Sequence, residues 1–370
     1  MKAILHIGFP KTGTTTIQKH LDGNRGGLVK QGFYLPKYHV IHPIMDALEL
    51  EGAGHVPLFY LCSEVYGKET AMNFLLKISG YSRDDASREF LDSFWKQTRE
   101  EIIEHKETAD TIIFTCEFLV FLLEDQVGKL HEILAEMFDE ITVVVYLRRQ
   151  MESLISWYAE VNKIGVPFPT FETLLATQPG VSENYFFNYE MVLGMWSKYF
   201  GEKNIRPRIF HRKDMVNNDL LDDFTRTIGI DNSPLTRFDS VNHALPSDVI
   251  EFCRLLNKSY PLYVLNGPAN LNRLVAAKAL VERYAKSGNR ACHPGREQVR
   301  EIIDLYRESN NAVARKYLGK EQLFDEDVSN YPEKPAPHGL TPLRSAEIAA
   351  WLWEYGLAYD KKEKRLEIPS

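Results

Sequence analysis

Apolar and polar positions follow two alternating periods along the first 230 residues of this 370-residue chain. Short β-branched runs, typical of strands buried on both faces, are separated by stretches in which apolar residues recur every three or four positions, the period of a helix. The expected strands are residues 2–7, 111–116, 141–147 and 206–211. This order predicts an α/β fold in which a central, mainly parallel sheet is flanked by helices in three layers.

The hydrophobic pattern changes in two places. Residues 32–80 are rich in Gly, Pro, His and Tyr and too irregular for a single element, so we expect an insertion that faces the substrate. Beyond residue 260 amphipathic helical stripes continue without a catalytic signature, and Thr341-Pro342 is a suitable N-cap and first residue for a further helix. We therefore expect a core domain over residues 1–260 and a helical C-terminal region over residues 261–370, packed on that core.

The loop after the first strand carries the candidate chemistry. Its sequence is Gly8-Phe9-Pro10-Lys11-Thr12-Gly13-Thr14-Thr15-Thr16, and it precedes a helix whose apolar residues Ile17 and Leu21 are four positions apart. A glycine-bearing loop between a strand and a helix N-terminus directs backbone N–H groups and the positive end of the helix dipole at one point. The threonine hydroxyls and one lysine add further donors, so the sequence predicts an anion-binding cradle for phosphate or sulfate.

This loop differs from the loop that binds nucleoside triphosphates. That template is Gly, four residues and then Gly-Lys-Ser/Thr, whereas Thr14 stands here in place of the lysine and Lys11 is the only lysine of the loop. The segment instead resembles the Pro-Lys-Thr/Ser-Gly-Thr-Thr loop of sulfotransferases that use 3′-phosphoadenosine 5′-phosphosulfate (PAPS). The resemblance implies a P-loop-like fold and metal-free PAPS binding, with 3′-phosphoadenosine 5′-phosphate (PAP) as product. It assigns the 5′-phosphosulfate to Pro10, Lys11, Thr12, Gly13, Thr14, Thr15 and Thr16.

A second motif follows the strand at residues 141–147, which ends in Arg148-Arg149. Sulfotransferases hold the 3′-phosphate of PAPS with an Arg at a strand end and a Ser eight residues later, and Arg148 and Ser156 have that spacing. An arginine suits the task because it is permanently charged and grips a phosphate with two parallel hydrogen bonds. The family more often has Asn or Asp and then Pro where this chain has Arg149 and Gln150. The spacing favours Arg148, and Arg149 remains the alternative.

Sulfuryl transfer needs positive charge at the leaving phosphate and a base for the acceptor proton. Lys11 is the candidate for the charge. Glu117 directly follows the strand at residues 111–116, and ligands of open parallel sheets bind at the carboxyl ends of strands. The resemblance also places the base at the end of this strand. Two alternatives stay open: Glu117 only orients Lys11 or caps the next helix, or His42 in the insertion is the base.

Composition narrows the class of partner. A formal net charge of −7 provides no general basic field, which argues against nucleic acid as a partner.

The cysteines and histidines show no metal-binding pattern. The four cysteines lack the spacing of zinc ligands, and free thiols suit a reducing, cytoplasmic compartment. The histidines at positions 39, 42 and 55 are spaced irregularly, so we expect them to be surface residues. Since the first strand is expected to begin at residue 2, we expect no leader before it, and no apolar stretch is long enough to span a bilayer.

We therefore expect a cytoplasmic bacterial sulfotransferase that acts on a hydroxyl, or an amine, of a saccharide or another small metabolite. Two other classes remain: a P-loop nucleotide kinase or NTPase, and a non-catalytic scaffold that binds PAP but transfers nothing.

Overall fold

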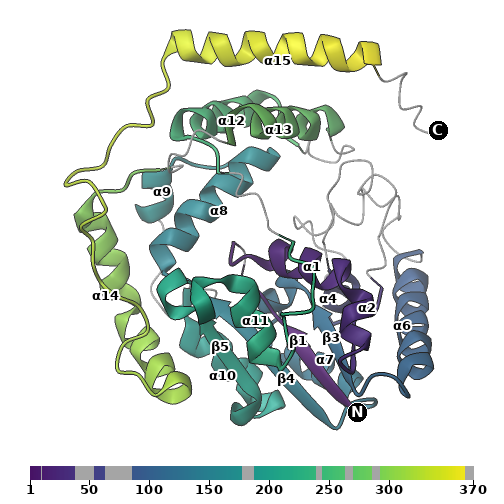
Figure 1. Ribbon diagram of the computed structural model, residues 1–370. Helices are drawn as coiled ribbons and strands as arrows, with labels where there is room; N and C mark the ends of the chain where they lie inside the picture. Colours follow the sequence, from purple (N-terminus) through teal and green to yellow (C-terminus); the bar gives the residue numbers. More distant parts are fainter. Residues whose placement is uncertain are drawn as a thin grey trace. The chain divides into compact units, whose positions relative to one another are not determined.

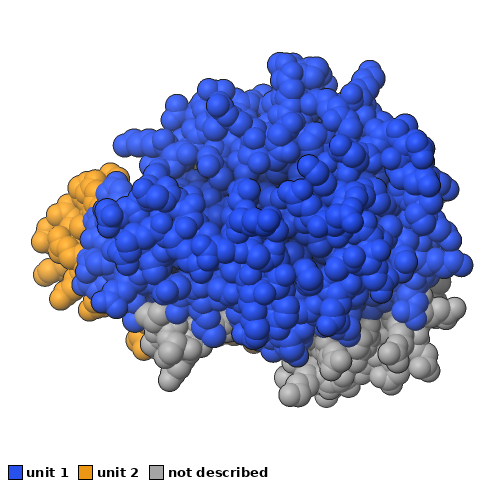
Figure 2. Space-filling model, turned by 90° about the horizontal axis from the view of Figure 1, so that it is seen from below, with its two compact units in different colours: residues 1–153, 179–240, 302–326 blue, residues 154–178, 241–301, 327–370 orange. Residues whose placement is uncertain are grey.

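The computed structural model describes residues 1–9, 11–37, 54–62, 86–176, 187–238, 244–262, 270–285 and 292–362. Pro10, His42 and most of the expected insertion lie outside these ranges. The chain forms two compact units, coloured separately in Figure 2: a first unit of residues 1–153, 179–240 and 302–326, and a second unit of residues 154–178, 241–301 and 327–370. The two units interleave along the chain, so neither coincides with the segments 1–260 and 261–370 expected from the sequence.

The first unit is built on a five-stranded sheet in the order β2-β3-β1-β4-β5, with every pair of neighbours parallel (Figure 1). Its strands are β1 (Lys2–His6), β2 (Phe33–Tyr34), β3 (Thr111–Thr115), β4 (Glu140–Leu147) and β5 (Ile205–Ile209). Four of them match the expected strands closely. The two-residue β2 was not expected, because it lies at the start of the irregular segment.

Helices cover both faces of this sheet, which confirms the predicted three-layer α/β fold. One face packs on α1 (Thr14–Gly23), α2 (Arg25–Val29) and α11 (Leu220–Ile228). The other packs on α4 (Val56–Cys62), α6 (Ala86–His105), α7 (Glu124–Ala135), α10 (Tyr189–Phe200) and the π-helical turn η7 (Ala314–Leu318). The short 3-10 helices are η1 (Glu117–Phe121), η3 (Glu202–Asn204), η4 (Arg212–Asp214) and η5 (Val216–Asn218).

Successive side chains of a strand enter opposite cores, as a strand buried on both faces requires. In β4, Val144 and Tyr146 pack with α1 and α11, whereas Val143 and Val145 pack with α7 and α10. The predicted burial of this strand on both faces is therefore confirmed.

The second unit is helical. Its helices are α9 (Phe171–Ala176), α12 (Ser247–Ser259), α13 (Leu271–Tyr284) and α15 (Pro342–Lys362), together with the end of α8 (Gln150–Ile164) and the start of α14 (Arg296–Val313). The expected cap of the last helix is confirmed, because the Arg344 N–H donates to Thr341 Oγ1 at 3.1 Å. Among the helices that the structure describes, none is long and apolar enough to cross a membrane.

The topology of the first unit creates a diverging point beside its central strand. The chain leaves β1 through α1 and α2, on one face, and reaches β2; it leaves β4 and returns to β5 through α10, on the opposite face. Loops that diverge in this way open a crevice at the carboxyl ends of the strands, where α/β sheets bind ligands. The loops after β1 and β4 therefore flank the expected ligand position.

Candidate functional site

The loop after β1 is fixed by its backbone. Gly13 is the N-cap of α1 and has a φ of +80°, a conformation that favours glycine. A Cβ atom on Gly13 would lie 2.3 Å from Cδ2 of Leu220, so the neighbouring side chain also excludes larger residues. Lys11 shares the left-handed conformation, with a φ of 67°. The buried Thr12 hydroxyl donates to the Phe9 carbonyl at 2.6 Å and closes the loop.

The N-terminus of α1 offers unused hydrogen-bond donors. No described side chain caps it, and its first turn contains no acidic residue. The first backbone N–H groups of a helix have no partner within the helix, and the dipole makes this end positive. The hydroxyl of Thr14 is buried and, within the described ranges, lacks a hydrogen-bond partner. A buried donor without a partner, next to uncapped amides, fits the oxygen atoms of a phosphate or sulfate.

Arg148, the first residue after β4, connects the two sequence motifs. Its Nη1 donates to the Lys11 carbonyl oxygen at 3.1 Å, and its Nε donates to Glu152 Oε2 at 3.2 Å. The guanidinium carbon lies 5.6 Å from the centroid of the Phe210 ring. The structure thus brings the cradle loop and the second motif together where the loops after β1 and β4 diverge.

Arg149 has a different environment. Its Nη2 lies 3.2 Å from Asp325 Oδ2, a carboxylate in the segment 302–326 of the first unit. Arg148 therefore contacts the cradle loop and Arg149 pairs with Asp325, and the assignment of the phosphate to Arg148 stays a prediction. Ser156 lies on α8 in the part that belongs to the second unit, and its role stays a prediction.

Glu117 begins η1 at the carboxyl end of β3. The N–H of the preceding Cys116 donates to the His6 carbonyl at 3.0 Å, and the Ile7 N–H donates to the Val144 carbonyl at 3.0 Å. These bonds hold the ends of β3, β1 and β4 side by side. Glu117, half-buried, therefore stands at the same edge of the sheet as the cradle loop, and its role as the base stays a prediction.

His6 also belongs to this site, although in the sequence it is only one residue within the apolar run of the first strand. Its ring is fully buried, and burial lowers its pKa to about 3, so the imidazole is neutral. Nδ1 lies 2.9 Å from Thr115 Oγ1, while Nε2 lacks a partner among the described residues. A Cβ on Gly8 would be 3.5 Å from this Nε2 and 2.5 Å from Thr14 Oγ1. Two unpaired polar groups thus converge beneath the loop.

The expectation that His55 is a surface residue is wrong. His55 is completely buried; its Nδ1 accepts from the Thr115 N–H, and its Nε2 lies 3.0 Å from the Pro36 carbonyl. The ring thus provides hydrogen-bond partners for the backbone of Thr115, at the end of β3, and of Pro36. The spacing of the histidines in the sequence does not indicate this structural role.

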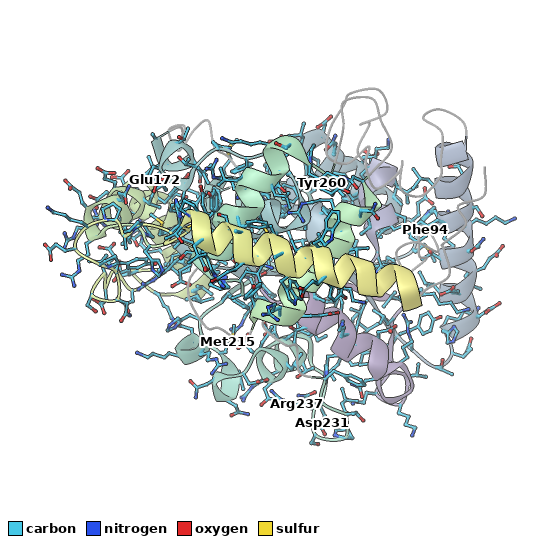
Figure 3. All side chains as sticks on the ribbon, turned by 90° about the horizontal axis from the view of Figure 1, so that it is seen from above. Phe94, Glu172, Met215, Asp231, Arg237 and Tyr260 are labelled. Carbon is cyan, nitrogen blue, oxygen red and sulfur yellow. The ribbon has the colours of Figure 1, made fainter. Side chains whose placement is uncertain are left out.

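The helix that supports Gly13 is itself anchored by a buried carboxylate. Asp223 of α11 accepts from the Tyr146 hydroxyl at 2.8 Å, from Arg208 Nε at 2.9 Å and from the Val216 N–H at 2.9 Å. At the start of α11, Asp219 caps two backbone N–H groups and also pairs with Arg237, which is labelled in Figure 3. These bonds fix α11, whose first residue, Leu220, packs against Gly13 of the cradle loop.

Comparison with known proteins adds one distant likeness. Neither a family model nor a curated protein sequence matches the chain. A solved structure of a sulfotransferase from Alicyclobacillus acidocaldarius is similar with a TM-score of 0.38 and 14% sequence identity, over 63% of this chain and 82% of that one. A likeness of this degree does not define the activity, which has to be argued from the site.

Proposed function

We propose that this protein is a PAPS-dependent sulfotransferase. The observation that carries the proposal is the hydrogen bond from Arg148 Nη1 to the Lys11 carbonyl, at 3.1 Å. It places a cradle built from amides and hydroxyls beside a permanently charged guanidinium, so one molecule with two separated anionic groups can engage both. A 3′-phosphorylated nucleotide that carries a 5′-phosphosulfate has this arrangement of charge.

In this proposal each part of the loop has a separate task. PAPS, when bound, supplies a sulfuryl group that is activated by its bond to the 5′-phosphate. The amides at the start of α1 and the hydroxyl of Thr14 hold the phosphosulfate oxygens. Lys11 provides positive charge where negative charge increases on the bridging oxygen, and a preplaced charge of this kind is a large term in catalysis. Arg148 and Ser156 hold the 3′-phosphate, which does not change in the reaction.

The acceptor is proposed to be a hydroxyl, or an amine, on a saccharide or another small metabolite. Its proton is taken by a base near the cradle, for which Glu117 is favoured by its position at the end of β3. His42 is the competing base. The cytoplasmic and bacterial setting expected from the sequence belongs to the same proposal.

Ligand-induced stabilisation tests the proposal first. With a chelator present, PAP at about 100 times its Kd should stabilise the protein by about 2.7 kcal/mol, measured as a rise in Tm. A clear shift with magnesium and ATP, but none with PAP, would instead support a kinase or NTPase. Labelled PAPS is then offered to saccharide, phenol, amine and lipid acceptors. PAP binding without transfer to any of these would identify a non-catalytic scaffold.

A further inference from the structure

The second unit contains a cavity of about 250 Å³ that has no part in the proposed transfer. Five separate segments line it: α8 through Tyr158, residues 170–172, residues 247–251 of α12, residues 292–298, and residues 335–338. Backbone hydrogen bonds fix its rim, because the Ala336 N–H donates to the His293 carbonyl and the Arg296 N–H donates to the Pro332 carbonyl, both at 3.0 Å. The cavity is therefore preformed, as small-molecule sites usually are.

A buried ion pair lies in its wall. Glu251 accepts from Arg254 Nε at 2.7 Å and from Arg254 Nη2 at 2.6 Å, one bond to each carboxylate oxygen. This bidentate pair fixes the carboxylate and neutralises it, yet each oxygen keeps a lone pair for a further donor. Glu251 is thus held ready to accept a hydrogen bond from a ligand.

His338 provides the complementary donor. The Leu340 N–H donates to His338 Nδ1 at 3.1 Å, so the hydrogen of the neutral ring is on Nε2. This Nε2 is 3.7 Å from Glu251 Oε1, which is too far for a direct hydrogen bond. A ligand hydroxyl placed between the two would bridge them by accepting from Nε2 and donating to the carboxylate. An ammonium group has no acceptor and does not fit this role.

Tyr158 adds a polar group without a partner. Its side chain lines the cavity and is only 4% exposed, and its hydroxyl forms no hydrogen bond in the part of the chain that the structure describes. A buried tyrosine hydroxyl normally has a partner. Burial raises the pKa of Tyr158, and nearby Cys292 and Glu251, which line the same cavity, raise it further. The phenol therefore stays protonated and available as a donor.

The remaining walls are apolar. Phe171 packs edge-on against Tyr158 with ring centroids 5.3 Å apart, and Ile250 and the prolines at positions 294, 335 and 337 complete the lining. Because Arg254 neutralises Glu251, the exposed carboxylate of Glu172, labelled in Figure 3, leaves the cavity slightly acidic and unfavourable for anions. A purely apolar ligand would leave the hydroxyl of Tyr158 without a partner and would not use the second lone pair of either Glu251 oxygen.

We propose that this cavity binds one neutral polyhydroxylated ring, a single saccharide unit. Its hydroxyls engage Tyr158, Glu251 and His338, and its C–H face packs on Phe171 and the prolines. The volume suits a molecule smaller than the drug-sized ligands that occupy cavities of about 300–1,000 Å³. The site lies wholly within the second unit and requires neither PAPS nor the cradle.

Saturation-transfer NMR and calorimetry on the full chain test this site, with glucose, galactose and N-acetylglucosamine as probes. At least one of them should bind, and Tyr158→Phe should weaken its binding by about 3- to 10-fold, the cost of one hydrogen bond. The matched control is Tyr260→Phe, which removes the hydroxyl of a tyrosine, labelled in Figure 3, that is 40% exposed and does not line the cavity. Glu172→Gln, compared with Glu354→Gln on α15, provides a second pair of variants with exposed side chains.

Three results would overturn the site: no saccharide bound up to about 20 mM, where a millimolar Kd would be saturated; equal affinity in the wild type and both cavity variants; or binding of choline in place of saccharides. The Tm rise induced by PAP should be the same in Tyr158→Phe as in the wild type. This measurement separates failure of the cavity proposal from failure of the proposed transferase function.

Discussion

The carboxyl edge of the sheet and the cavity of the second unit differ in the kind of polar group that each offers a ligand. At the sheet edge the binding groups include backbone amides: the left-handed turn at Gly13 leads into the uncapped amides of α1, and Arg148 is held beside this loop by its bond to the Lys11 carbonyl. In the cavity the polar groups are side chains, contributed by five segments that lie far apart in the sequence.

This difference decides how each region responds to substitution. In the cradle a side-chain change alters charge or proton transfer but leaves the amides in place, so binding and catalysis can be separated. In the cavity Tyr158→Phe removes a binding group outright. Three sets of variants at the sheet edge test whether binding and catalysis separate there, and they are given from the largest expected effect to the smallest.

The largest effect is expected from Glu117→Gln. If Glu117 is the base, this variant should turn over about 100- to 10,000-fold more slowly, while PAP binds with near-native affinity. The change keeps the shape of the side chain at the end of β3 and removes only its ability to take a proton. Steady-state transfer rates and calorimetric Kd values for PAP measure the two quantities.

His42→Ala is the comparison for this variant and should be milder. The reverse ranking would move the base to His42. Full activity in both variants would remove each of them from the mechanism and leave the acceptor proton to another group.

Lys11→Ala should lower the rate of transfer by about 100- to 1,000-fold, since its charge is needed most as the bridging oxygen leaves. The affinity for PAP should fall far less, because the amides of α1 and the Thr14 hydroxyl remain. Single-turnover rates and PAP titrations check this. If affinity falls as steeply as rate, the cradle depends on a side chain, and the contrast with the cavity is wrong.

The sequence predicted the first unit better than the second, because the features of the first unit depend on contiguous residues and the cavity of the second unit depends on segments far apart in the chain. The positions of four strands, the burial of β4 and the glycine of the cradle each follow from a short contiguous pattern. The two-residue β2 has no hydrophobic period to detect, and His6 and His55 gain their roles only from neighbours across the sheet. The cavity has no local signature at all.

The division into units was also beyond the sequence. The end of α14 and η7 bury Val313 and Ala314 in the core that covers β4, although they follow more than 50 residues of the second unit. Amphipathic stripes show that a helix has a buried face but not which core receives it. The expected boundary at residue 260 rested on sequence order alone.

The smallest effect separates the two arginines after β4. Arg148→Ala should weaken PAP binding by about 10- to 100-fold, the cost of one charged hydrogen-bonding group, with little change in kcat because the 3′-phosphate is unaltered by the reaction. Arg149→Ala should leave PAP binding nearly unchanged, since Arg149 faces Asp325, whose side chain is 71% exposed, and such surface pairs contribute at most about 1 kcal/mol. Calorimetric titration of both variants decides the register. Loss of PAP affinity in Arg149→Ala alone would show that the second motif is shifted by one residue and that the contact of Arg148 with Lys11 only holds the loop.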